Sequence, residues 1–144
     1  MPPGIRFLGI RIRAFAQATE VEERVLRAVE FACGTGEVEV ARTTGHFGNP
    51  MAVFDVELKK AADVKPFIGR MRDAGILAGL AGQEDARTDE DCVFHFRLDK
   101  QKAYTGELAL ATGKDVIDVR MKVGVYPARR EDAVRILSEW LADA

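Results

Sequence analysis

The chain has 144 residues, of which 47% are hydrophobic and 31% charged, and its net charge is −2. These values predict a single globular domain over residues 1–144 and exclude a bulk polycation, so any nucleic-acid contact must come from local patches. No apolar run is long enough to cross a membrane, and Cys33 and Cys92 lack the spacing of a disulfide framework or a metal site. We therefore expect an intracellular protein of a reducing compartment, with free thiols.

The first half of the chain predicts a strand, a helix and a hairpin. Alternation over residues 5–16 predicts a half-buried strand, whose core face carries Leu8, Ile10, Ile12 and Ala14. A helix is predicted over residues 19–33, with a capping box that starts at Thr19. Two alternating stretches, residues 37–40 and 51–58, then predict a hairpin with a long polar loop.

The second half adds two strands and three helices. In order, we predict a helix over 63–75, a strand over 92–98, a short helix over 99–106, a strand over 115–126 and a helix over 129–142. Asp63 is placed to cap the first of these helices, and the acidic stretch 84–91 predicts a solvated loop.

Each predicted strand has one apolar and one polar face. This pattern predicts an α+β fold with a mostly antiparallel sheet of about five strands and helices packed on one face. The predicted order is β-α-β-β-α-β-(short α)-β-α. The polar face of the sheet is then open to solvent or to a partner.

Cations and acids both lie on this polar face. Alternation places there the cations Arg11, Arg13, Arg97, Arg120 and Lys122, together with His95. The acids crowd the hairpin at Glu37, Glu39, Asp55 and Glu57. Cations that are separated from the acids would suit RNA, whereas cross-strand ion pairs would make this an ordinary solvated face. Both interpretations stay open.

The segment 99–106 has the composition of an anion site. Asp99 can cap a short helix whose first N–H groups would lie beside Lys100, Gln101 and Lys102, a combination that suits a phosphate. Tyr104 could stack on an unpaired base or lie half-buried in the core.

The turn Gly45-His46-Phe47-Gly48-Asn49-Pro50 is a third candidate. Its glycines permit the close approach of another backbone, and the side chains of His46 and Asn49 can hydrogen-bond to a ligand. Phe47 either stays at the loop tip or folds back onto the core.

Catalytic chemistry is not predicted. The sequence has no phosphate-binding glycine loop, no dinucleotide fingerprint and no nucleophile elbow. His46 and His95 lack ligand spacing, and the five acids between residues 84 and 91 lack that of a calcium-binding loop. We expect no enzymatic activity, no metal and no cofactor.

Four stretches, taken in order along the chain, resemble a known family. They are the first strand running into Ala18-Thr19-Glu20, the turn at residues 45–50, the segment Arg97-Leu98-Asp99-Lys100-Gln101-Lys102-Ala103-Tyr104-Thr105-Gly106, and Asp115-Val116-Ile117 with the strand that continues to Tyr126-Pro127. Together they resemble a small archaeal RNA-binding family whose members are described as exosome subunits and whose fold is similar to that of ribosomal protein L-five. The resemblance implies an α+β domain, RNA as ligand and a cytoplasmic, archaeal setting.

We predict a non-catalytic RNA-binding protein, accessory to RNA processing or degradation, with exosome or ribosome-related proteins as further partners. The predicted RNA contacts are Arg11, Arg13, His46, Asn49, Arg97, Lys100, Gln101, Lys102, Tyr104, Arg120 and Lys122. The alternative is a protein–protein adaptor, or a homodimer, that docks through the open sheet face. Segregated positive charge on that face would favour RNA, and evenly mixed charge would favour the adaptor.

Overall fold

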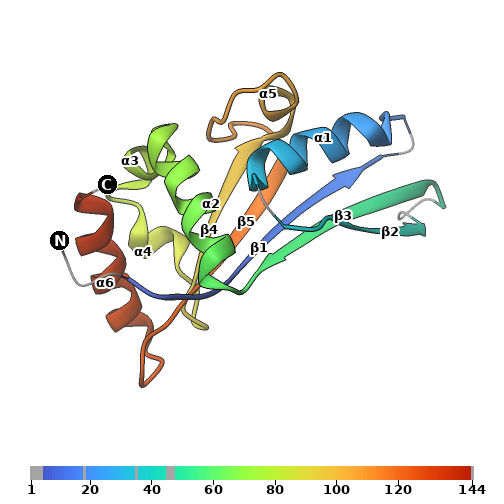
Figure 1. Cartoon of the computed structure of the whole chain (residues 1–144). Helices are drawn as coiled ribbons and strands as arrows, with labels where there is room; N and C mark the ends of the chain where they lie inside the picture. Colours follow the sequence, from blue (N-terminus) through green and yellow to red (C-terminus); the bar gives the residue numbers. More distant parts are fainter. Residues whose placement is uncertain (1–4, 18, 35, 45–47, 144) are drawn as a thin grey trace.

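The protein is a five-stranded antiparallel sheet with helices over one face (Figure 1). The computed structural model describes residues 5–17, 19–34, 36–44 and 48–143. The strands are β1 (Phe7–Ala16), β2 (Glu39–Thr44), β3 (Pro50–Leu58), β4 (Val93–Asp99) and β5 (Val116–Val123), in the spatial order β2-β3-β1-β5-β4. The helices are α1 (Glu22–Cys33), α2 (Ala61–Asp73), α3 (Ile76–Leu80), α4 (Glu84–Arg87), α5 (Lys100–Tyr104) and α6 (Arg130–Ala142). The predicted fold class is confirmed.

One row of side chains shows how alternation builds the core. Val56, Ile12, Val119 and Phe96 are register partners on four neighbouring strands, and all four are buried. The apolar sides of α1, α2 and α6 contribute further side chains to the same core. Because successive strand residues point to opposite faces, the residues between these core positions lie on the open face.

A β-bulge near the start of β1 changes which side chains are buried. The register with β5 shifts between Phe7 and Gly9, so Leu8 is an extra residue on β1. Phe7 is therefore buried against Trp140 of α6, with ring centroids 5.1 Å apart, whereas Leu8 is 50% exposed. The prediction that Leu8 lies on the core face was wrong, because strict alternation cannot anticipate an inserted residue.

Two of the three predicted helix caps, at Thr19 and Asp63, are not used. α1 begins at Glu22 with Val21 in the cap position and no side-chain cap, so the predicted capping box at Thr19 was wrong. α2 begins at Ala61 after Lys60, which places Asp63 inside the first turn rather than at the cap. The Asp63 charge still suits the positive end of the helix dipole there.

The hairpin formed by β2 and β3 is confirmed, but β2 continues to Thr44, beyond the predicted limit at residue 40. The predicted contact His46 and the predicted loop-tip residue Phe47 lie outside the described residues. The acidic stretch 84–91 is partly ordered rather than a solvated loop. It contains α4, and the buried Glu84 carboxylate accepts a hydrogen bond from the Gly82 N–H at 2.8 Å.

Both cysteines are free and buried. Burial raises the pKa of the Cys33 thiol to about 12, so this thiol is protonated at neutral pH and is a poor nucleophile. No helix among the described residues has the length and apolar character that a membrane crossing requires.

Candidate nucleic-acid interface

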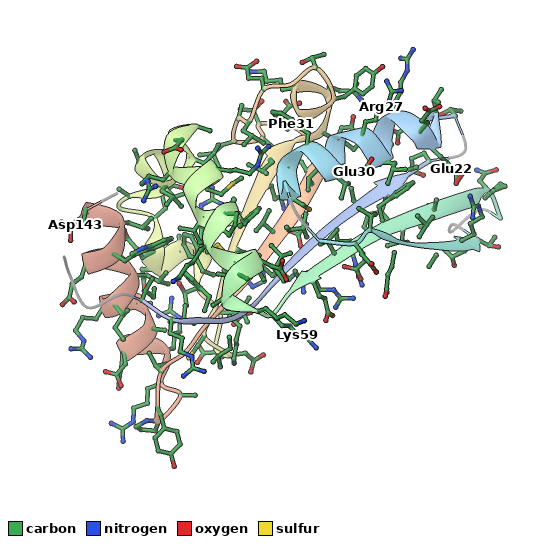
Figure 2. The ribbon with its side chains drawn as sticks, viewed as in Figure 1. Glu22, Arg27, Glu30, Phe31, Lys59 and Asp143 are labelled. Carbon is green, nitrogen blue, oxygen red and sulfur yellow. The ribbon has the colours of Figure 1, made fainter. Side chains whose placement is uncertain are left out.

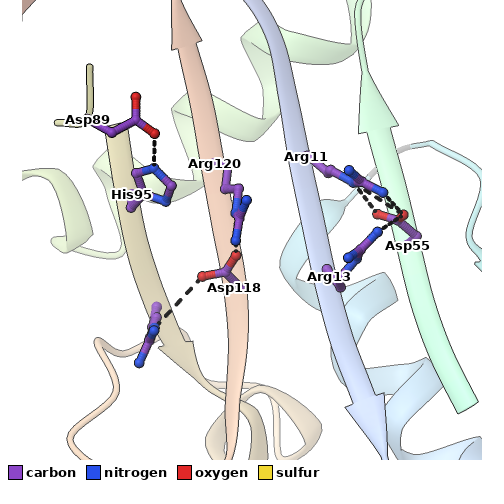
Figure 3. A network of polar contacts seen from close by, with 8 residues as sticks. Arg11, Arg13, Asp55, Asp89, His95, Asp118 and Arg120 are labelled. Carbon is purple, nitrogen blue, oxygen red and sulfur yellow. Dashed lines mark hydrogen bonds and ion pairs between the residues drawn. The ribbon is translucent and has the colours of Figure 1, made fainter. Parts of the chain in front are cut away.

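Two arginines of β1 share one carboxylate of β3 on the open face (Figure 3). Arg11 donates to Asp55 from Nε to Oδ1 at 3.1 Å and from Nη2 to Oδ2 at 2.7 Å, and Arg13 Nη2 donates to the same Oδ2 at 3.1 Å. Burial alone would raise the pKa of Asp55, but the hydrogen bonds from Arg11 and Arg13 outweigh burial and lower it. The cluster keeps one net positive charge.

A second shared carboxylate lies between β5 and β4. Arg120 Nε donates to Asp118 Oδ2 at 2.9 Å, and Arg97 Nε lies 3.8 Å from Asp118 Oδ1. Beside this cluster, His95 Nε2 lies 2.8 Å from Asp89 Oδ2 (Figure 3). Burial would raise the pKa of Asp89, but hydrogen bonds, first of all from His95, lower it.

Cations and acids therefore alternate across the open face. One row of register partners reads Glu39, Asp55, Arg13, Asp118 and Arg97 from β2 to β4. Lys122 belongs to the same face and donates to the backbone carbonyl of Asp91. The five cations that alternation predicts on this face do lie there, and each contacts a carboxylate or a carbonyl. The charge on this face is mixed rather than segregated.

Lys100 is an internal residue, which corrects its prediction as a phosphate contact. Its side chain is only 4% exposed, and Nζ lies 2.8 Å from Glu20 Oε2 and 2.6 Å from Asp115 Oδ1. Nζ also donates to the Phe15 carbonyl at 2.8 Å. These three oxygens use all three ammonium hydrogens, so Lys100 ties the end of β1, the start of α1 and the loop before β5 together.

The backbone donors at the start of α5 are also used within the protein. Asp99 caps the helix as predicted, since its Oδ1 accepts the Lys102 N–H at 2.9 Å. The Lys100 N–H donates to the Asp115 carbonyl at 3.3 Å, and Gln101 Nε2 donates to Asp115 Oδ2 at 2.7 Å. Two of the predicted free N–H groups, those of Lys100 and Lys102, therefore already donate to the protein's own oxygens.

Two other predicted contacts on α5 remain at the surface. Lys102 is exposed, and Tyr104 is half-buried beneath the guanidinium of Arg24, whose Cζ lies 5.4 Å from the ring centroid. The tyrosine face that a base would stack on is thus covered by a cation–π contact within the protein. Sequence reasoning did not single out Arg24.

A basic cleft opens between the start of β1, α2 and α6; we call it the α2–α6 cleft. Its volume is about 710 Å³, and its apolar lining includes Phe7, Val64, Ile68 and Trp140. Its cationic lining consists of Arg6, Lys59, Lys65 and Arg72. No acid occurs among the described residues that line it. Figure 2 shows Lys59, which lines this cleft, between the end of β3 and the start of α2.

Comparison with known proteins identifies the family. Residues 9–123 match the family described as RNA binding. The chain belongs to this RNA-binding family. The RNA-binding protein PAB1135 of Pyrococcus abyssi (strain GE5 / Orsay) is 40% identical over an alignment of 147 residues, and the match covers 92% of each chain. The uncharacterized protein MJ0213 of Methanocaldococcus jannaschii is 30% identical over an alignment of 136 residues, and the match covers 88% of this chain and 91% of the relative.

Solved structures of two archaeal proteins are similar to this chain over nearly its whole length. Protein AF2318 from Archaeglobus fulgidus is 34% identical with a TM-score of 0.84, and the match covers 93% of this chain and 99% of that one. Mth689 from Methanothermobacter thermautotrophicus is 28% identical with a TM-score of 0.79, and the match covers 96% and 99% of the two chains. The family is archaeal, as the resemblance implied.

In this member of the RNA-binding family, the predicted contacts do not form one site. The open face holds those of β1, β4 and β5, α5 holds Gln101, Lys102 and Tyr104, and Asn49 is exposed just before β3. No three His, Cys, Asp or Glu side chains among the described residues gather in the manner of a metal site.

Sequence reasoning missed the α2–α6 cleft. One signal was present: Lys65 and Arg72 are seven residues apart, a spacing that places them on one side of a helix, with Ile68 between them. The remaining lining comes from β1, the end of β3 and α6, and their convergence follows only from the three-dimensional structure.

Proposed function

We propose that the protein is a non-catalytic, cytoplasmic RNA-binding protein that assists RNA processing or degradation together with exosome or ribosome-related proteins. The observation that carries the proposal is the match to the RNA-binding family over residues 9–123. The 40% identity to the RNA-binding protein PAB1135 supports it. The predicted likeness to ribosomal protein L-five stays a prediction.

The distribution of charge supports local RNA contacts on a chain whose net charge is −2. RNA binding draws most of its affinity from cations that contact phosphates and release counterions. Unpaired bases add stacking on aromatic side chains. The α2–α6 cleft offers both kinds of group, since four cations surround a lining that contains Phe7 and Trp140.

The proposal is tested by titrating a labelled single-stranded oligoribonucleotide with the isolated protein over a series of salt concentrations. Four or five phosphate contacts predict that log Kobs falls with log[salt] with a slope of about −3, at about −0.7 per contact. An affinity that is absent near physiological salt, or that does not respond to salt, contradicts direct RNA binding.

The balanced charge of the open face supports a second candidate function, a protein–protein adaptor. Asp55 and Asp118 each neutralise one of two arginines, and Glu39 and Glu57 add further negative charge to this face. An adaptor predicts a partner that stays bound after nuclease treatment, together with negligible affinity of the isolated chain for RNA. Tight, salt-dependent RNA binding in the titration above decides against it.

A further inference from the structure

We propose that the α2–α6 cleft binds an unpaired nucleotide of single-stranded RNA, with the base against the apolar lining at Trp140 and the flanking phosphates at the cationic rim. This inference rests on the proposed function and deepens it, because it names the binding site and the kind of RNA. None of the contacts that the sequence predicts lies in this cleft.

The rim provides positive charge that phosphates can reach. Arg6 and Lys65 are exposed and make no ion pair with any other residue in the described part of the chain. Lys59 Nζ lies 3.3 Å from Glu57 Oε2, and Arg72 Nε lies 3.5 Å from Oδ1 of its neighbour Asp73. Both pairs are solvent-exposed, and exposed pairs are weak enough to be exchanged for a phosphate contact.

The helix α2 spaces two of these cations along the cleft. Lys65 and Arg72 are seven residues apart, which is two helical turns and about 10 Å along the axis. They can therefore contact different phosphates of one strand. Arg6 and Lys59 approach from β1 and from the end of β3, so the cations come from three separate segments.

The lining between these cations is suited to a base. Phe7 and Val64 are almost fully buried, and Ile68 and Trp140 are half-buried. The edge-to-face contact between Phe7 and Trp140, with rings at 69°, fixes the indole in place. A volume of about 710 Å³ falls within the range of about 300–1,000 Å³ that is usual for small-ligand sites, so one nucleotide fits.

The open face is a poorer phosphate site by the same criteria. A hollow of about 430 Å³ there is also lined by cations, including Arg11 and Arg120. Three acids, Glu57, Asp89 and Asp91, line the same hollow and would repel a phosphate. An acidic peptide could use the cationic rim of the α2–α6 cleft, but it lacks a flat base to stack on Trp140. The combination of rim and lining favours RNA.

The first test removes two rim cations that lie on the surface of α2. The double variant Lys65→Ala with Arg72→Ala should flatten the salt slope from about −3 to about −1.6, since each lost contact accounts for about 0.7. At 0.1 M salt the affinity for the labelled oligoribonucleotide should fall about 25-fold. Urea unfolding should give nearly the same free energy of unfolding for the wild-type protein and the double variant, because these side chains are exposed.

Arg27→Ala with Lys114→Ala is the matched control. It also removes one arginine and one lysine, both of them exposed and outside the cleft, and it should leave affinity and slope unchanged. An equal loss in this control would mean that only total charge matters, and the inference would be wrong. The same conclusion follows if Arg97→Ala with Arg120→Ala weakens binding while the α2 variant does not.

The second test uses Trp140 as a built-in probe, because the chain contains a single tryptophan. Single-stranded RNA should quench its fluorescence with the same midpoint as the anisotropy titration, whereas a duplex of equal length should not. Binding without any change in Trp140 emission would refute the base-stacking role. Poly-glutamate that competes as well as RNA would show a site for acidic peptides instead.

Failure of the proposed function and failure of this inference give different experimental results. If the wild-type protein binds no RNA at any salt concentration, the proposed function fails and this inference fails with it. If the wild-type protein binds RNA with the expected slope but the Lys65 and Arg72 variant binds equally well, only the location is wrong.

Discussion

The sequence predicts Lys100 to be a surface cation, but in the structure it is buried and connects three segments of the chain. It stands between Asp99 and Gln101 in a polar segment, yet its ammonium contacts Glu20, Asp115 and the Phe15 carbonyl. Two of these partners lie more than 75 residues away along the chain, so local sequence cannot reveal them. The nearby Lys102, by contrast, is exposed, as expected.

We predict that Lys100→Met lowers the free energy of unfolding by about 2–3 kcal/mol. This is below the ~3–5 kcal/mol seen when one partner of a fully buried pair is removed, because Glu20 and Asp115 remain partly hydrated. Lys102→Met, on the exposed side of the same helix, should change it by less than about 0.5 kcal/mol. Equilibrium urea unfolding measures both, and equal effects of the two substitutions would contradict the structural role.

Acid titration gives an independent readout of the same contact. Burial would raise the pKa of Asp115, but hydrogen bonds from Gln101 and Lys100 outweigh burial and lower it. A lowered folded-state pKa stabilises the protein above the unfolded value of about 4, and this stability is lost as the pH falls through the folded pKa. The wild-type protein should therefore lose stability below about pH 4 more steeply than Lys100→Met, and parallel curves would contradict this account.

At the scale of elements, alternation and helical spacing predicted every strand and every long helix, and they predicted that each strand has one apolar and one polar face. The errors occur where one element depends on another. The bulge at Leu8 follows from the pairing of β1 with β5, and the late start of α1 leaves Glu20 free to reach Lys100. The shared carboxylates of the open face likewise depend on register between distant strands.

The connection between α1 and β2 depends on Gly36. Its φ of +94° favours glycine, and an added Cβ would lie 2.9 Å from Leu58 Cδ2 and 3.1 Å from Val56 Cγ1, both in the core. Gly36→Ala should therefore destabilise the protein by about 2–4 kcal/mol, from backbone strain and overpacking together. Gly75 has a similar φ of +80°, but an added Cβ would meet no atom within 4 Å. Gly75→Ala should therefore lower the free energy of unfolding by only about 1–2 kcal/mol in the same denaturation experiment. Equal losses would mean that the contact with Leu58 adds nothing.

At the scale of the whole molecule, the α2–α6 cleft is a local cationic site, lined by four cations and by no acid among the described residues. The α2–α6 cleft lies at the end of the sheet that carries α6, and β2 and the start of β3 lie at the other end (Figure 1). The net charge of −2 conceals this local site, because acids elsewhere offset the cations of the rim. Composition could exclude a polycation, but it could not locate the site, whose residues come from four separate segments.

The central claim is that the protein binds single-stranded RNA and does so at the α2–α6 cleft. Ultraviolet cross-linking of a single-stranded oligoribonucleotide to the wild-type protein, followed by mass spectrometry of the peptides, tests both parts in one measurement. We expect cross-links in peptides that contain Phe7, residues 59–72 and Trp140, and we expect high salt to abolish them. Cross-links confined to β4 and β5, or no cross-links under conditions in which a control RNA-binding protein reacts, would contradict the account.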